Sequence, residues 1–240
     1  MTPELKQKIQ ISLGAAILIA GVRTAYILYE RHEAAQPVVT RELPLNADYY
    51  VVPKKLHPYD LQSAKELTKQ PVWVKEGYRY TYYPYEHGRA DFKHDAGLLL
   101  PIEKLQITDV ITEASPGNPG QRQVMAVFEK DGKSYAFPVG AVKGGDYQIY
   151  SDEVLYIQDP HELYKHWTAE TWAAIEQHQV KQGMNELQAD FAIGMGIPER
   201  SSNPQVKTVN YPNGGKPVSI TYRDGKAEVI RLEAGSGADS

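Results

Sequence analysis

The pattern of apolar positions first isolates residues 9–29, IQISLGAAILIAGVRTAYILY, in which Arg23 is the one charged residue. A bilayer core is crossed by about 20 mostly apolar helical residues. The pattern therefore predicts a transmembrane signal-anchor over 9–29, with residues 1–8 as a cytoplasmic N-terminus. Arg23 either extends its side chain to the membrane interface or contacts an acidic group or a lipid in a membrane complex. A cleaved signal peptide is the alternative, but residues 33–35 make a poor cleavage site, and we favour retention.

Residues 30–59 have no helical period and are interrupted by prolines, which predicts an extended linker. Residues 60–158 follow as a β-rich domain. It begins with a short helix at 60–69, for which Asp60 is a suitable cap. Its short apolar and alternating segments, separated by turn residues such as Asp131-Gly132, predict a small all-β unit, and we expect an SH3-like barrel.

The pattern changes to helices followed by strands over residues 159–232. Three features here are typical of helix starts: an aspartate before a proline, a threonine, and an Asn-x-x-Gln capping box. The expected helix caps are Asp159, Thr168 and Asn185, and the expected strands are 206–211, 218–222 and 226–232. This order predicts helices on one face of an antiparallel sheet, and residues 233–240, EAGSGADS, read as a disordered tail.

Three stretches of the C-terminal segment together resemble a known family. Residues 180–188, VKQGMNELQ, are followed by Gly196-Ile197-Pro198 and then by 218–227, VSITYRDGKA. This arrangement resembles the SmpA/OmlA family, the BamE-like small lipoproteins of outer-membrane assembly. The resemblance covers about residues 170–232, and it implies an ααβββ domain, an envelope location and a non-enzymatic protein-binding role. The chain departs from the family in having no lipid-accepting cysteine and in carrying the additional 60–158 domain.

Composition excludes several classes of function. The formal net charge is −4, so we expect no broad basic surface for nucleic acid. The chain has no cysteine, which excludes disulfides, thiol catalysis and cysteine–zinc sites.

No catalytic motif is apparent. His161 and His166 are five residues apart, which does not match the i, i+4 pair of a helical zinc site. The loop at 86–95, EHGRADFKHD, contains histidines and carboxylates that could ligate a metal, although a solvated loop explains the same residues. We therefore expect no catalytic residue, no cofactor and no resident metal.

Two groups of aromatic residues are candidates for binding a partner. The first lies in 159–172, DPHELYKHWTAETW, and such residues are favoured in interfaces, although the tryptophans also suit core packing. The second alternates along one predicted strand, where an aromatic face could bind glycan or peptide, or be a half-buried sheet face. The candidate residues are Tyr164, His166, Trp167 and Trp172 in the first group and Tyr78, Tyr80 and Tyr82 in the second.

These observations combine into one function and two alternatives. The sequence predicts an α+β protein of the inner membrane, single-pass, with its large part in the periplasm. It would scaffold or modulate a complex of envelope proteins without catalysis. The alternatives are a module that binds cell-wall glycan or peptide through the tyrosine face, and a metal-dependent enzyme that uses the 86–95 loop.

Overall fold

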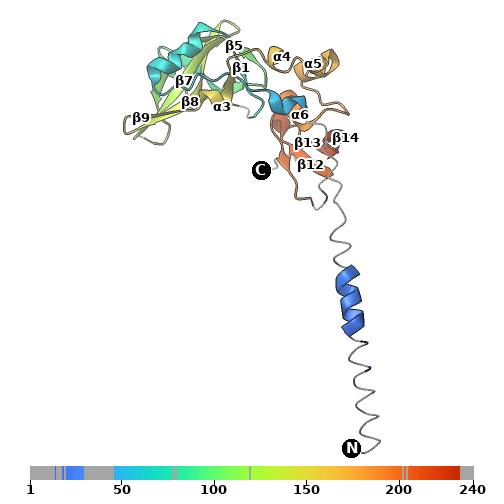
Figure 1. Ribbon diagram of the computed structural model, residues 1–240. Coiled ribbons are helices and arrows are strands. Elements are labelled where there is room, and N and C mark those ends of the chain that lie inside the picture. Colours follow the sequence, from blue (N-terminus) through green and yellow to red (C-terminus); the bar gives the residue numbers. More distant parts are fainter. Residues whose placement is uncertain are drawn as a thin grey trace, which may run out of the picture. The chain divides into compact units, whose positions relative to one another are not determined.

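The structure is a computed structural model that describes residues 14, 18, 20–29, 46–77, 80–118, 120–201, 203 and 205–232 (Figure 1). The chain separates into two compact units, residues 1–46 and residues 47–240. The predicted tail at 233–240 and the predicted cytoplasmic segment at 1–8 lie outside the described residues.

Residues 20–29 are helical within the first unit. In the part of the chain that the structure describes, no helix combines the length and the apolar character needed to cross a bilayer. The predicted transmembrane signal-anchor at 9–29 and the single-pass inner-membrane location are corrected accordingly. The prediction rested on the apolar character of the run, which does not by itself establish a helix of spanning length.

The second unit opens with short helices and a small sheet. Asp60 caps the first α-helix, as predicted, and its side chain accepts a hydrogen bond from the Ser63 amide at 2.7 Å. The sheet is antiparallel, and its middle strand is β1. The helical segments are η1 (Ala47–Tyr50), α2 (Leu61–Ala64) and η2 (Lys65–Lys69), and the strands, in sheet order, are β10 (Leu155–Tyr156), β1 (Val72–Val74) and β5 (Lys104–Leu105).

A seven-stranded antiparallel sheet forms the largest element, and its centre is the long β7–β8 hairpin closed by Asp131-Gly132. Apolar residues alternate between its two faces, so that Phe128 packs on the side of α2 and η2 while Val127 packs on the opposite side. The path runs β3 (Arg89–Ala90), β2 (Thr81–Glu86), β8 (Lys133–Lys143), β7 (Gln121–Lys130) and β6 (Ile107–Ala114), with β4 (Gly97–Leu98) on β2 and β9 (Asp146–Ile149) on β8.

This sheet corrects the expected SH3-like barrel. Its strand order runs from β3 to β6 without closing, and the described residues include no pairing between those two strands. The prediction was wrong because short alternating strands have the same sequence pattern in an open sheet and in a barrel. The length of β7 and β8, ten and eleven residues, favours the open hairpin.

The C-terminal elements begin at the helix caps that the sequence predicted. The side chains of Asp159, Thr168 and Asn185 each accept a hydrogen bond from a backbone amide of the following helix. Beyond α6 the chain forms an antiparallel sheet of order β11-β12-β13-β14. The elements are α3 (Ser151–Val154), α4 (Pro160–Leu163), α5 (Ala169–Glu176), α6 (Glu186–Ile193), β11 (Ile197–Pro198), β12 (Val206–Tyr211), η3 (Asn213–Gly215), β13 (Val218–Arg223) and β14 (Lys226–Leu232).

The fold is therefore mainly β, and the predicted α+β arrangement with a BamE-like ααβββ domain is corrected. The C-terminal sheet has four strands rather than three, because residues 197–198 pair with β12. Its hydrophobic core also includes Trp73 and Tyr156, which come from the β1–β10 pair earlier in the chain.

Candidate functional site

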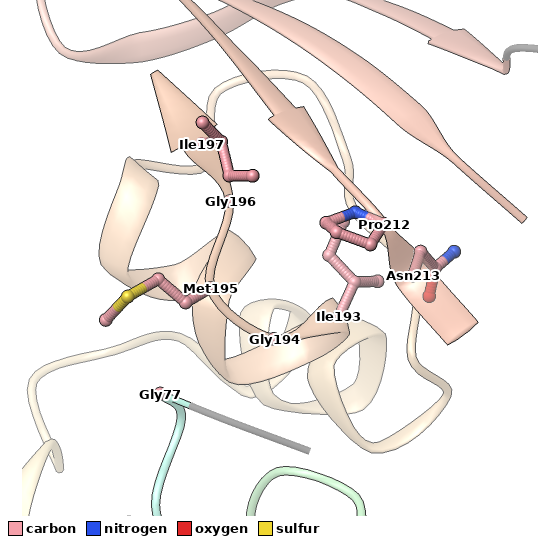
Figure 2. A pocket seen from close by; sticks show the side chains of 8 residues that line it. All are labelled: Gly77, Ile193, Gly194, Met195, Gly196, Ile197, Pro212 and Asn213. Carbon is pink, nitrogen blue, oxygen red and sulfur yellow. The ribbon is translucent and has the colours of Figure 1, made fainter. Parts of the chain in front are cut away.

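A groove with a largely apolar lining and a volume of about 320 Å³ lies beside strand β11 (Figure 2). Most of its lining comes from the segment that leaves α6, which carries Met195 and Ile197. These side chains are 47% and 67% exposed, so the groove presents apolar surface to solvent. The remaining lining residues are Gly77, Ile193, Gly194, Gly196, Pro212 and Asn213.

Two glycines allow the segment to take this course. Gly194 ends α6 with φ 84° and ψ 171°, a conformation that is essentially restricted to glycine. A Cβ on Gly196 would lie 2.4 Å from Val209 Cγ1 and 2.9 Å from the Tyr211 ring. The segment therefore packs directly on β12, and it carries Met195 and Ile197 past that contact towards solvent.

The groove's walls are tied together by backbone contacts. The Met195 amide donates a hydrogen bond to the Gly77 carbonyl at 3.2 Å, which joins the β11 segment to the chain that leaves β1. The Glu199 amide donates to the Thr208 carbonyl at 2.9 Å and holds the far end of β11 on the sheet. Both ends of the exposed segment are thus fixed, and the groove is preformed.

A buried polar cluster lies behind the groove, because Tyr211 contacts Gly196 with its ring and reaches the cluster with its hydroxyl. The Tyr211 and Tyr222 hydroxyls are 2.8 Å apart. Burial, with the neighbouring Glu186 carboxylate, raises the pKa of Asp190 to about 7, against the opposing effects of Tyr211 and Lys207. Asp190 Oδ1 is buried with no hydrogen-bond partner among the described residues. The Asp190 carboxyl is therefore protonated in mildly acidic solution and loses its proton near neutral pH.

A second tyrosine–carboxylate contact lies on the opposite wall. The Tyr156 hydroxyl donates a hydrogen bond to Glu76 Oε2 at 2.7 Å, and Glu76 precedes the groove residue Gly77. Burial, reinforced by the Glu76 charge, raises the pKa of Tyr156, so this hydroxyl remains protonated as a donor. This hydrogen bond joins β10 to Glu76, the residue before Gly77 in the groove lining.

The structure places the aromatic residues of the 159–172 segment in the hydrophobic core. Tyr164, Trp167 and Trp172 are each less than 10% exposed. Tyr164 stacks on Trp167 with ring centroids 4.5 Å apart, and Trp167 packs on Trp172 at 5.1 Å. His166 lies at the edge of this cluster, with about a third of its side chain exposed.

The cluster is closed by a carboxylate that the sequence pattern did not single out. Asp48 in η1 has a side chain only 5% exposed. Its Oδ1 accepts hydrogen bonds from His166 Nε2 at 2.6 Å and Trp167 Nε1 at 2.7 Å, while its Oδ2 accepts one from Asn185 Nδ2 at 2.7 Å. Because Asn185 also caps α6, Asp48 helps to fix the helix that leads into the groove.

The second aromatic group does not form an exposed strip among the described residues. Tyr82 is 8% exposed and packs edge-on against Phe128 and Tyr135. Tyr80 is partly buried against the same core, and Tyr78 lies outside the described residues. Glycan or peptide binding through this face stays a prediction.

The remaining candidate residues lie elsewhere. Arg23 is exposed within the helical residues 20–29 of the first unit. In the 86–95 segment, which the sequence suggested as a loop and which includes strand β3, Asp91 Oδ2 lies 2.7 Å from His94 Nδ1, and these side chains are 48% and 75% exposed. Over the described ranges of the chain, no three histidine, aspartate or glutamate side chains converge as metal ligands.

No family model, no curated protein and no solved structure matches this chain. The resemblance to the SmpA/OmlA family therefore rests on the three sequence stretches alone. The assignment of function depends on the site itself.

Proposed function

We propose that this chain is a non-catalytic protein-binding module, which holds a partner polypeptide by receiving its apolar side chains in the groove beside β11. The observation that carries the proposal is the exposure of Met195 and Ile197 on the rim of a preformed hollow. Single exposed apolar residues are ordinary, but two of them on one apolar cavity are typical of an interaction site.

The chemistry of the rim favours side-chain insertion. Methionine is unbranched and polarisable, so Met195 can adapt to a partner's surface. Strand addition is disfavoured because Pro198 lacks the N–H that a paired strand needs. Backbone nitrogens of successive residues point to opposite sides of a strand. Because the Glu199 amide points to β12, the Pro198 nitrogen points to the open edge of the sheet. The partner is therefore held by its side chains rather than by a backbone ladder.

Selection of random displayed peptides on the immobilised full-length protein tests this proposal. We expect the selected peptides to share one or two large apolar side chains. We expect Ile197→Asp to weaken their binding at least about tenfold, because a charge in an apolar interface centre loses a contact and is desolvated. Leu232→Asp is the matched control, since Leu232 is 82% exposed on β14, at the opposite edge of the same sheet. Equal binding by the Ile197 variant and wild type would contradict the proposal.

A further inference from the structure

A second hollow, of about 280 Å³, lies where the sheets meet the end of α5. Its residues come from three separate places: the turn between β4 and β5, the end of β7, and the end of α5 with the residues that follow it. They are Leu100, Ile102, Glu103, Lys130, Glu176 and His178.

The backbone of this pocket is held in an unusual conformation at two positions. Ile102 has φ 56° and His178 has φ 53°, and a positive φ is a genuine outlier for a β-branched residue. Three hydrogen bonds hold the Ile102 turn: its own amide to the Val74 carbonyl at 2.8 Å, the Glu103 amide to the Leu100 carbonyl at 3.2 Å, and the Leu100 amide to Glu103 Oε2 at 3.1 Å. Backbone strain of this kind concentrates at ligand-binding sites.

The lysine of the pocket is already neutralised. Lys130 Nζ lies 2.6 Å from Glu103 Oε1, while the other oxygen of Glu103 accepts the Leu100 amide. An anionic ligand would therefore have to displace Glu103 from a lysine that is itself about one-third exposed. The pocket is not built for an anion.

Two acceptor atoms remain for a ligand. Glu176 uses Oε1 for His161 Nε2 at 3.1 Å, and its Oε2 makes no hydrogen bond to another described residue. His178 Nδ1 lies 3.0 Å from the Ala192 carbonyl oxygen, which can only accept, so Nδ1 carries the proton. In the neutral imidazole Nε2 is then an acceptor. Glu176, whose side chain is 57% exposed, and His178 line one pocket together with Leu100 and Ile102.

We propose that this pocket binds a primary ammonium or guanidinium group carried on an aliphatic stem, the chemistry of a basic side chain or of a free diamine. The cation faces Glu176 and His178, and the stem packs on Leu100 and Ile102. Long basic groups bury their methylene stems on apolar surface in this way. The site is separate from the groove beside β11 and does not depend on the function proposed for it.

The test is an NMR titration of the His178 ring nitrogens in the full-length protein. The probes are N-acetyl-lysine-N-methylamide, 1,5-diaminopentane and, as the uncharged analogue, N-acetyl-norleucine-N-methylamide. We expect a saturable shift of His178 Nε2 with the two cations and none with the norleucine compound. Tighter binding of the lysine compound assigns the site to a basic side chain, and tighter binding of the diamine assigns it to a free amine.

Variants separate the two parts of the site. Glu176→Gln should weaken binding of the cations about tenfold, as expected for loss of a charge-assisted hydrogen bond. Glu170→Gln, on the same helix and about four-fifths exposed, should leave it unchanged. Ile102→Gly relieves the positive φ and removes the apolar contact, so it should keep the fold and weaken binding. No saturable shift with either cation, an equal shift with the norleucine compound, or unimpaired binding by Glu176→Gln would overturn the proposal.

Discussion

Replacing Asp48 with alanine is expected to lower the free energy of unfolding by about 3 kcal/mol. The Asp48 carboxylate receives three donors at 2.6–2.7 Å from parts of the chain more than a hundred residues away. Removing one partner of a buried charged network leaves the others without an acceptor, which costs roughly 3–5 kcal/mol. The lower end applies because His166 is partly exposed and remains accessible to water.

Urea unfolding of the full-length protein, followed by tryptophan fluorescence, measures this effect. Asp48→Asn preserves the shape of the side chain but supplies one acceptor oxygen in place of two. We therefore expect it to lower the free energy of unfolding by less than Asp48→Ala does. Asp146→Ala, an exposed aspartate on β9, is the control and should change stability by less than about 0.5 kcal/mol. A loss of under about 1 kcal/mol for Asp48→Ala would show that the carboxylate does not organise the aromatic core.

The second large effect is a dependence of stability on pH that originates at Asp190. Its pKa is about 7 in the folded protein, compared with 3.8 as the ordinary value, because of burial and the nearby Glu186. Below pH 4 the Asp190 carboxyl is protonated in both the folded and the unfolded protein, so it does not lower the free energy of unfolding. As the pH rises from 4 to 7 the unfolded state releases its proton first, so stability falls, and above pH 7 the loss is complete. The expected total is roughly 4 kcal/mol at most.

Asp190→Asn tests this account, because the amide stays neutral at every pH. Unfolding free energies at pH 4.5 and pH 8 should show the variant gaining stability relative to wild type as the pH rises. Asp146→Asn makes the same chemical change on an exposed β9 position and should follow wild type at both pH values. A difference between Asp190→Asn and wild type that stays constant with pH would exclude Asp190 as the titrating group.

Local signals in the sequence predicted the element boundaries of the C-terminal region well. The caps at Asp159, Thr168 and Asn185 are confirmed, and so are the strands at 206–211 and 226–232. A cap or a hairpin turn depends on residues within four positions of one another, and such contacts can be read from one sequence.

Contacts between residues far apart in the chain could not be predicted from these local signals. Gly196-Ile197-Pro198 was noted in the sequence as part of the family resemblance, whereas residues 197–198 add a strand to the sheet and present Ile197 to solvent. Nothing local distinguishes an exposed isoleucine from a core one. Asp48 reads as an ordinary linker aspartate, because the residues that bind it lie 118–137 positions later. The aromatic residues of 159–172 were visible in the sequence, but their packing on Phe191 of α6 was not.

Photo-crosslinking in cells that make this protein tests most directly whether the groove beside β11 binds a partner protein. A benzophenone amino acid replaces Ile197 in one full-length variant and Tyr59, which is 76% exposed outside the groove, in another. We predict one dominant crosslinked partner from position 197, absent from position 59 and lost when Met195→Asp is added. No adduct at position 197, or the same adducts from both positions, would contradict the assignment of the β11 groove as a protein-binding site.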